Sequence, residues 1–176
     1  MVTENFNRTI DIWINELNQY EFNQLCTKPA PGSWSLGQVY MHLISETSHF
    51  VEQIKICLST NNHATEAAAD AAIVMFGNNN FPDEILEGPP SNANTPQPEH
   101  KEQLMHGLLR LKEEINSLAA SIANNQCKGK TKHPGLNYFN ATEWLQFAEM
   151  HLRHHLRQKQ RIENALKIKY GGTLSI

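Results

Sequence analysis

The 176-residue chain carries a net charge of −3 at pH 7 with histidine neutral. It therefore lacks the excess of positive charge that binds a protein to nucleic acid by counterion release. Hydrophobic residues make up 40% of the sequence and charged residues 19%, which suits one globular domain that buries its own core. No apolar run is long enough to span a bilayer, so we expect no membrane segment.

The cysteines and the first residues favour the cytoplasm. Cys26, Cys57 and Cys127 are isolated from one another, and a sparse, odd count fits a reducing compartment better than a disulfide scaffold. The opening stretch MVTENFNRTIDIWI is acidic and polar, whereas a signal peptide begins basic and continues apolar. We therefore expect a cytoplasmic protein.

Two helical patterns occupy the first third of the chain. In the first, from about Glu4 to Leu25, apolar residues recur at three- and four-residue spacing until the breaker cluster TKPAPGS. The second begins at Ser35, which has the capping-box spacing with Gln38, and ends near residues 58–60. Both patterns predict amphipathic helices.

Residues 61–98 read as a long connection between the second and third helices. The alanine-rich piece ATEAAADAAIVMF can form a short helix, and GNNNFPDEILEGPPSNANTPQP is rich in breakers. A connection of this length is usually functional, or it is a crossover that lets the next helix run parallel to the previous one. A tolerated surface insertion is the alternative.

Two further helices are predicted in the second half. A stripe of leucine and isoleucine marks a helix from about Glu99 to Asn124, and NNQCKGKTKHPGLNYFN then breaks the pattern. The last helix begins near Asn140, where Glu143 completes a capping box, and continues to about Tyr170 before two glycines. No segment is predicted as a strand. Four long amphipathic helices predict an all-α four-helix bundle that forms one domain over residues 1–176.

The stretch HLRHHLRQ at residues 151–158 of the last helix is unusually rich in histidine. His151 and His155 are four residues apart on one face, so their imidazoles can bind one metal ion. His154 is rotated about 100° from His155 and is expected to face solvent or an interface. Gln158 is either a hydrogen-bond partner of the site or part of a polar surface. A basic surface helix is the alternative reading of the whole stretch.

The second helix offers a third ligand. His42 and His49 are seven residues apart; His42 lies among apolar residues and His49 among polar ones. A buried core histidine is the alternative for His42, and the surface is expected for His49. Glu46, one turn from His42, is a candidate general base, with a solvated helix acid as the alternative. His133 precedes a proline in a loop and is expected to be structural. The remaining histidines carry no signal: His63, His100 and His106.

Two stretches resemble the DinB-like superfamily when taken together. PGSWSLGQVYMHLI is similar to the start of that superfamily's second helix, and HPGLNYFNATEWLQFAEMHLRHHLRQ is similar to its last-helix signature. The resemblance implies a four-helix bundle with up-down-down-up topology, in which residues 61–98 form the long crossover. It also implies one divalent metal ion, often nickel or zinc, bound by His42, His151 and His155.

The resemblance leaves the activity open. Three histidine ligands keep a coordination position free, as in catalytic sites. Some relatives are thiol-dependent S-transferases that use a low-molecular-weight thiol, and others are described as metal-dependent hydrolases, so we expect an enzyme of either kind acting on a small molecule. A non-catalytic metal- or ligand-binding stress-response protein is the second hypothesis, and a metal-free interaction bundle is the third. Members of this superfamily often form homodimers.

Overall fold

The computed structural model describes residues 2–81, 94–124 and 126–168. The expected all-α character is confirmed, since helices dominate this part of the chain and strands form only one small sheet. In chain order, the elements are α1 (Val2–Leu17), α2 (Phe22–Cys26), α3 (Leu36–Ser59), α4 (Asp70–Asn78), α5 (Lys101–Ala123), β1 (Thr131–His133), β2 (Asn137–Phe139) and α6 (Ala141–Leu166).

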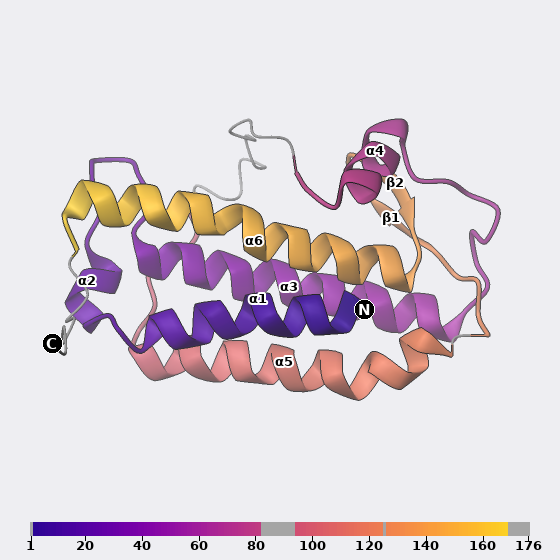
Figure 1. Cartoon of the computed structure of the whole chain (residues 1–176), viewed down its shortest axis with the longest axis horizontal. Helices are drawn as coiled ribbons and strands as arrows, with labels where there is room; N and C mark the ends of the chain where they lie inside the picture. The colour runs from indigo at the N-terminus through magenta and orange to yellow at the C-terminus, as the bar shows by residue number, and fades with distance from the viewer. Residues whose placement is uncertain (1, 82–93, 125, 169–176) are drawn as a thin grey trace, which may run out of the picture.

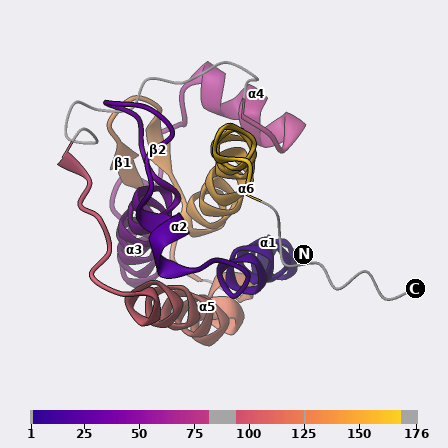
Figure 2. The ribbon, with the colours of Figure 1, turned by 90° about the vertical axis from the view of Figure 1, so that its left-hand side faces the viewer.

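The four long helices lie side by side around a shared apolar core (Figure 1). Helices α1 and α3 each pack against both α5 and α6, an arrangement that is visible end-on in Figure 2. In Figure 1, α3 and α5 run from left to right, whereas α1 and α6 run from right to left. Helix α4 and the small sheet pack on α6 near the end where that helix begins.

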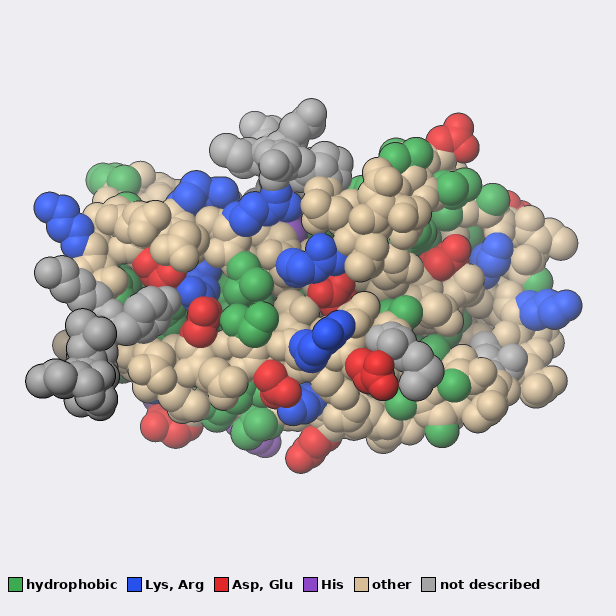
Figure 3. Space-filling view, in the orientation of Figure 1, with side chains coloured by type: hydrophobic (Ala, Val, Ile, Leu, Met, Phe, Trp, Pro, Cys, Tyr) green, Lys and Arg blue, Asp and Glu red, His purple; other side chains and the backbone are tan. Residues whose placement is uncertain are grey.

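Charged side chains of both signs are spread over the face shown in Figure 3, and basic ones gather where α6 runs. No helix in the described ranges has both the length and the apolar character needed to cross a membrane.

Both capping boxes predicted from the sequence are present. The Ser35 hydroxyl accepts from the backbone N–H of Gln38, whose side-chain oxygen accepts from the backbone N–H of Ser35, each over 3.2 Å. Asn140 and Glu143 make the same exchange at the start of α6, over 2.9 and 2.7 Å. These bonds satisfy backbone donors that a helix start leaves unpaired. The predicted starts of both helices are therefore confirmed, as is the end of α3 at Ser59.

The prediction of one helix from Glu4 to Leu25 is wrong in its last third. Helix α1 ends at Leu17, and the short helix α2 begins only at Phe22. Between them the buried Tyr20 donates a hydrogen bond from its hydroxyl to the Glu163 carboxylate of α6. Burying this aromatic ring and pairing its hydroxyl outweighs helix continuity, which adds little stability by itself.

Helix α6 is shorter than predicted. It ends at Leu166, and Lys167 adopts a left-handed conformation with φ of 51°. The N–H groups of Lys167 and Ile168 then bond to carbonyl groups of the last turn, as in helix ends that use a left-handed residue. The predicted end near Tyr170 is therefore wrong by a few residues, and the two glycines after it lie outside the described residues.

The prediction of no strands is also wrong, because residues 131–139 form a short antiparallel hairpin. Thr131 pairs with Phe139 and His133 with Asn137, which has a positive φ of 63°. Strands of three residues are too short to show alternation, but the buried Phe139 ring anchors the hairpin against Trp144 of α6 at a centroid distance of 5.0 Å. The hairpin thereby closes over the first turn of α6.

The connection between α3 and α5 contains the expected short helix as α4, which starts later than the alanine-rich piece. Residues 82–93 of this connection lie outside the described residues. Where the chain is described again, the Thr95 carbonyl accepts from the Gln38 side chain over 2.6 Å, and the Gln97 side chain accepts from the Ser35 hydroxyl over 2.8 Å. The chain has thus returned to the end of the molecule where α3 begins.

Candidate metal centre

Three histidines that the sequence singled out meet between α3 and α6. His42 projects from the first third of α3, and His151 and His155 from the middle of α6, which packs along α3. The Nε2 atom of His151 lies 3.3 Å from that of His42 and 3.2 Å from that of His155. One nitrogen from each of the three lies within 4.8 Å of the others.

The spacing of these nitrogen atoms suits a metal ion. A tetrahedral zinc centre with nitrogen ligands at about 2.0–2.1 Å separates neighbouring ligand atoms by about 3.3–3.4 Å. Hydrogen bonds among the three rings cannot satisfy all of their nitrogens. His151 Nε2 faces two other ring nitrogens, and a neutral imidazole has only one N–H to donate. The buried Nδ1 of His151 has no partner among the described residues. The donor set therefore fits a divalent cation.

Gln158 orients one of the three rings. Its side-chain oxygen lies 2.6 Å from Nδ1 of His155 and accepts the proton of that nitrogen. With the proton held at Nδ1, the lone pair of Nε2 points into the cluster, which is the tautomer that a metal ligand needs. Of the two readings that the sequence left open for Gln158, the structure favours the hydrogen-bond partner.

The surroundings keep the three imidazoles neutral. Burial lowers the pKa of His42 to about 4. Burial, reinforced by repulsion from His42, lowers the pKa of His155 to about 3. Burial and the other two rings hold the pKa of His151 well below its usual value. Neutral imidazole is the form that binds metal, so no proton has to be displaced at pH 7.

Aromatic side chains enclose the cluster. The Trp34 ring lies 5.0 Å from the ring of His42, and the Phe50 ring lies 5.6 Å from that of His151. Phe81 packs at 6.5 Å from the ring of His151, and its exposed fraction is 5%. These rings limit the access of water and strengthen electrostatic interactions at the three nitrogens.

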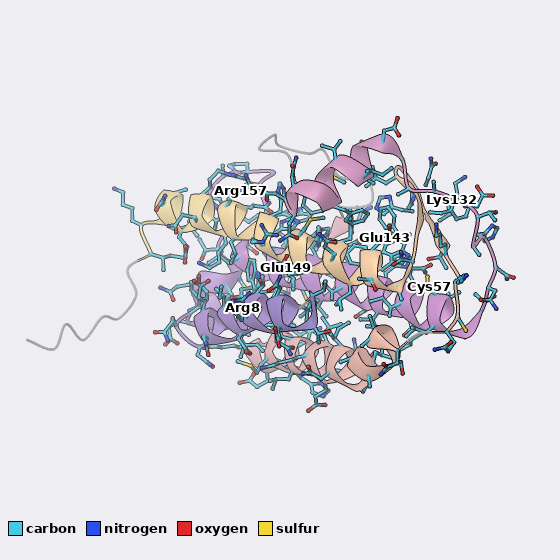
Figure 4. All side chains as sticks on the ribbon, turned by 45° about the vertical axis from the view of Figure 1, so that its right-hand side comes forward. Arg8, Cys57, Lys132, Glu143, Glu149 and Arg157 are labelled. Carbon is cyan, nitrogen blue, oxygen red and sulfur yellow. The ribbon has the colours of Figure 1, made fainter. Side chains whose placement is uncertain are left out.

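A buried carboxylate fixes α6 next to the cluster. Glu149 is only 4% exposed, and it accepts from the Thr9 hydroxyl of α1 over 2.8 Å and from the Arg153 guanidinium over 2.9 Å. Arg153 also donates to the carbonyl of Asn79, at the end of α4. Figure 4 shows Glu149 on the side of α6 that faces α1. The four-residue spacing of Glu149 and Arg153 could have indicated this ion pair from the sequence. The burial of Glu149 could not have been predicted in that way.

The other histidines that the sequence weighed stay outside the cluster. His154, which was expected to face solvent or an interface, packs its ring on Phe81 at 5.5 Å and is partly exposed. His49 is exposed, as expected. His133 packs on Phe147 at 4.9 Å, and burial, followed by the charge of His49, lowers its pKa to about 4. Its expected structural role agrees with this packing.

Glu46, the candidate general base, is partly exposed on α3. It forms no hydrogen bond or ion pair with the three histidines in the part of the chain that the structure describes. The structure therefore brings together the three predicted ligands but not this carboxylate.

The fold and this site define a class of protein: a mostly helical chain with an enclosed three-histidine group that can hold a metal ion. The family model described as the DinB superfamily matches residues 5–158. The chain therefore belongs to the DinB superfamily. No match was found among curated proteins or among solved structures.

Proposed function

We propose that this protein is a metal-dependent enzyme that acts on a small molecule, with one divalent ion bound by His42, His151 and His155. The observation that carries the proposal is the convergence of the three rings: His151 Nε2 lies 3.3 Å from that of His42 and 3.2 Å from that of His155, and one nitrogen from each lies within 4.8 Å of the others. Nickel and zinc are the metals that the family resemblance favours, and both accept imidazole ligands.

Two reaction types fit such a centre: hydrolysis and the transfer of a group to a low-molecular-weight thiol. His42, His151 and His155 would hold the divalent ion, which would lower the pKa of a bound water or thiol. The protein's own contribution is positional. Gln158 holds His155 in the binding tautomer, and the rings of Trp34 and Phe81 shield the centre from bulk water.

Turnover by metal-loaded protein tests this proposal. Wild type and His155→Ala are assayed against a panel of thiol-transfer reactions and a panel of ester, amide and phosphoester hydrolyses. We expect turnover in the wild type and its loss in His155→Ala. His106→Ala, a variant at an exposed position of α5, should retain it. Metal-loaded protein that turns over no substrate in either panel would contradict the enzyme and favour a non-catalytic metal- or ligand-binding protein of the stress response.

We further propose that residues 1–176 form one domain with the up-down-down-up bundle topology of the superfamily, and that the protein is a cytoplasmic homodimer. The opposite directions of α1 and α6 relative to α3 and α5 support the topology. Light scattering of the purified protein measures its mass in solution, and the mass of a single 20.0 kDa chain would contradict the dimer.

A further inference from the structure

A cleft of about 210 Å³ lies beside the three histidines, between the chain that leads into α3 and the C-terminal half of α6. Its lining consists of Pro29, Ser33, Trp34, Gln158, Arg161 and Ile162. Two of these residues also contact the histidines. The Trp34 ring packs on His42 at 5.0 Å, and the Gln158 side chain is hydrogen-bonded to His155. The cleft and the candidate metal centre therefore share two side chains as walls.

The charge of this cleft is set by Arg161. No acidic residue of the described ranges lines it, and Arg161 is exposed. Two neighbouring cations of α6 are already neutralised, since Lys159 pairs with two carboxylates at 2.8 and 3.0 Å and Arg153 with one at 2.9 Å. Arg161, by contrast, forms no ion pair with any carboxylate in residues 2–81, 94–124 and 126–168. Its guanidinium is thus open to an anionic ligand.

We propose that this cleft binds the anionic end of the substrate, a carboxylate or a phosphate, and that Arg161 is the residue that recognises it. The inference rests on the proposed function and deepens it by naming the substrate class. A planar guanidinium offers two parallel N–H donors to a carboxylate or a phosphate. The Trp34 ring provides an apolar wall for the part of the molecule that follows the anionic group.

The size of the cleft suits one end of a small molecule. Pockets that enclose a whole drug-sized ligand measure about 300–1,000 Å³, so a cleft of about 210 Å³ holds one end of a molecule. Arg161 lies six residues after His155, a rise of about 9 Å along the helix, and helical side chains lean back toward the N-terminus. Measured along the helix axis, the anionic group would therefore lie within about 9 Å of the histidines.

Tryptophan fluorescence can report on this cleft selectively. Trp13 and Trp144 are fully buried, whereas Trp34 is partly exposed and lines the cleft. The probes are 3-phenylpropionate, phenyl phosphate and the neutral 3-phenylpropanamide, titrated at constant ionic strength. The variants are Arg161→Gln, which removes the charge, and Arg161→Lys, which keeps the charge but lacks the two parallel N–H donors of the guanidinium. Arg110→Gln, on α5 and outside the cleft lining, is the control with the same change in net charge.

We expect the wild type and Arg110→Gln to bind at least one anion about 10- to 100-fold more tightly than the amide, the loss expected when a charged hydrogen-bond partner is missing. In Arg161→Gln that preference disappears, and in Arg161→Lys it is intermediate. The two anions identify whether carboxylate or phosphate is the natural group. Equal binding of the amide and both anions by wild type, or an unchanged preference in Arg161→Gln, would overturn the proposal.

The same titration in His151→Ala separates this inference from the proposed metal centre. If anion preference persists there while metal is absent, the Arg161 site exists independently of the metal. If the wild type binds metal but prefers no anion, the inference fails and the metal centre stands. If the wild type prefers an anion but binds no metal, the proposed function fails while recognition by Arg161 is upheld.

Discussion

Acid should destabilise the metal-free protein because the fold keeps the histidine cluster, of which His42 is buried and His151 and His155 are partly buried, in its neutral form. In the folded state the pKa of His42 is about 4 and that of His155 about 3, whereas both return to about 6.5 when the chain unfolds. Between these values the unfolded chain binds more protons than the folded one. The free energy of unfolding therefore falls as the pH falls below about 6.5.

The expected loss is large compared with the stability of a typical domain. Each such histidine removes about 1.4 kcal/mol per pH unit, or about 2 kcal/mol between pH 6.5 and pH 5. His42 and His155 together thus account for about 4 kcal/mol, against a typical total of about 5–15 kcal/mol. His133 adds to the loss in the same direction, since its folded pKa is also about 4, but it is less enclosed and solvent reduces its share.

Urea unfolding followed by circular dichroism, with a chelator present, measures this effect at about pH 7, 6 and 5. His42→Gln is uncharged at every pH and should reduce the slope of unfolding free energy against pH by about 1.4 kcal/mol per unit. His106→Gln changes an exposed histidine of α5 and should leave the slope as it is. A wild-type free energy that stays constant from pH 7 to pH 5 would refute the buried, neutral cluster.

Two further substitutions test the environment of the site. Gln158→Leu removes the hydrogen bond to His155 and should weaken metal binding about 10- to 100-fold, measured by competition with a chromophoric chelator; Gln160→Leu, at an exposed position of the same helix, should match wild type. Lys159→Met removes the cation that pairs with the buried Glu163 and the partly buried Glu16, and it should cost about 3–5 kcal/mol in urea unfolding. Lys112→Met breaks a more exposed pair and should cost at most about 1 kcal/mol; equal losses in the two lysine variants would contradict the buried network.

The starts of the helices could be predicted where side chains near in sequence decide them. Ser35 with Gln38 and Asn140 with Glu143 cap their helices through bonds that span only three residues. The break after Leu17 could not be predicted, because it depends on Tyr20 reaching Glu163, a residue 143 positions away. The hairpin at residues 131–139 escaped prediction for a similar reason, since its stability comes from packing on α6.

The three histidines of the candidate site could be singled out from the sequence, whereas the side chains around them could not. The four-residue spacing of His151 and His155 places both on one face of a helix, and the family resemblance supplied His42. The packing of Trp34 and Phe81 around these rings joins stretches that lie far apart in the sequence, and it leaves no local pattern. The role proposed for Arg161 likewise depends on which of its neighbours on α6 are already paired with carboxylates.

The central claim is that His42, His151 and His155 bind one divalent metal ion. Elemental mass spectrometry of tag-free protein tests it most directly, with the triple variant His42→Ala, His151→Ala, His155→Ala alongside and circular dichroism to check that the variant is folded. We expect about one equivalent of metal in the wild type and none in the variant. A wild type that holds no metal after dialysis against nickel and zinc, or a folded variant that retains it, would contradict the account.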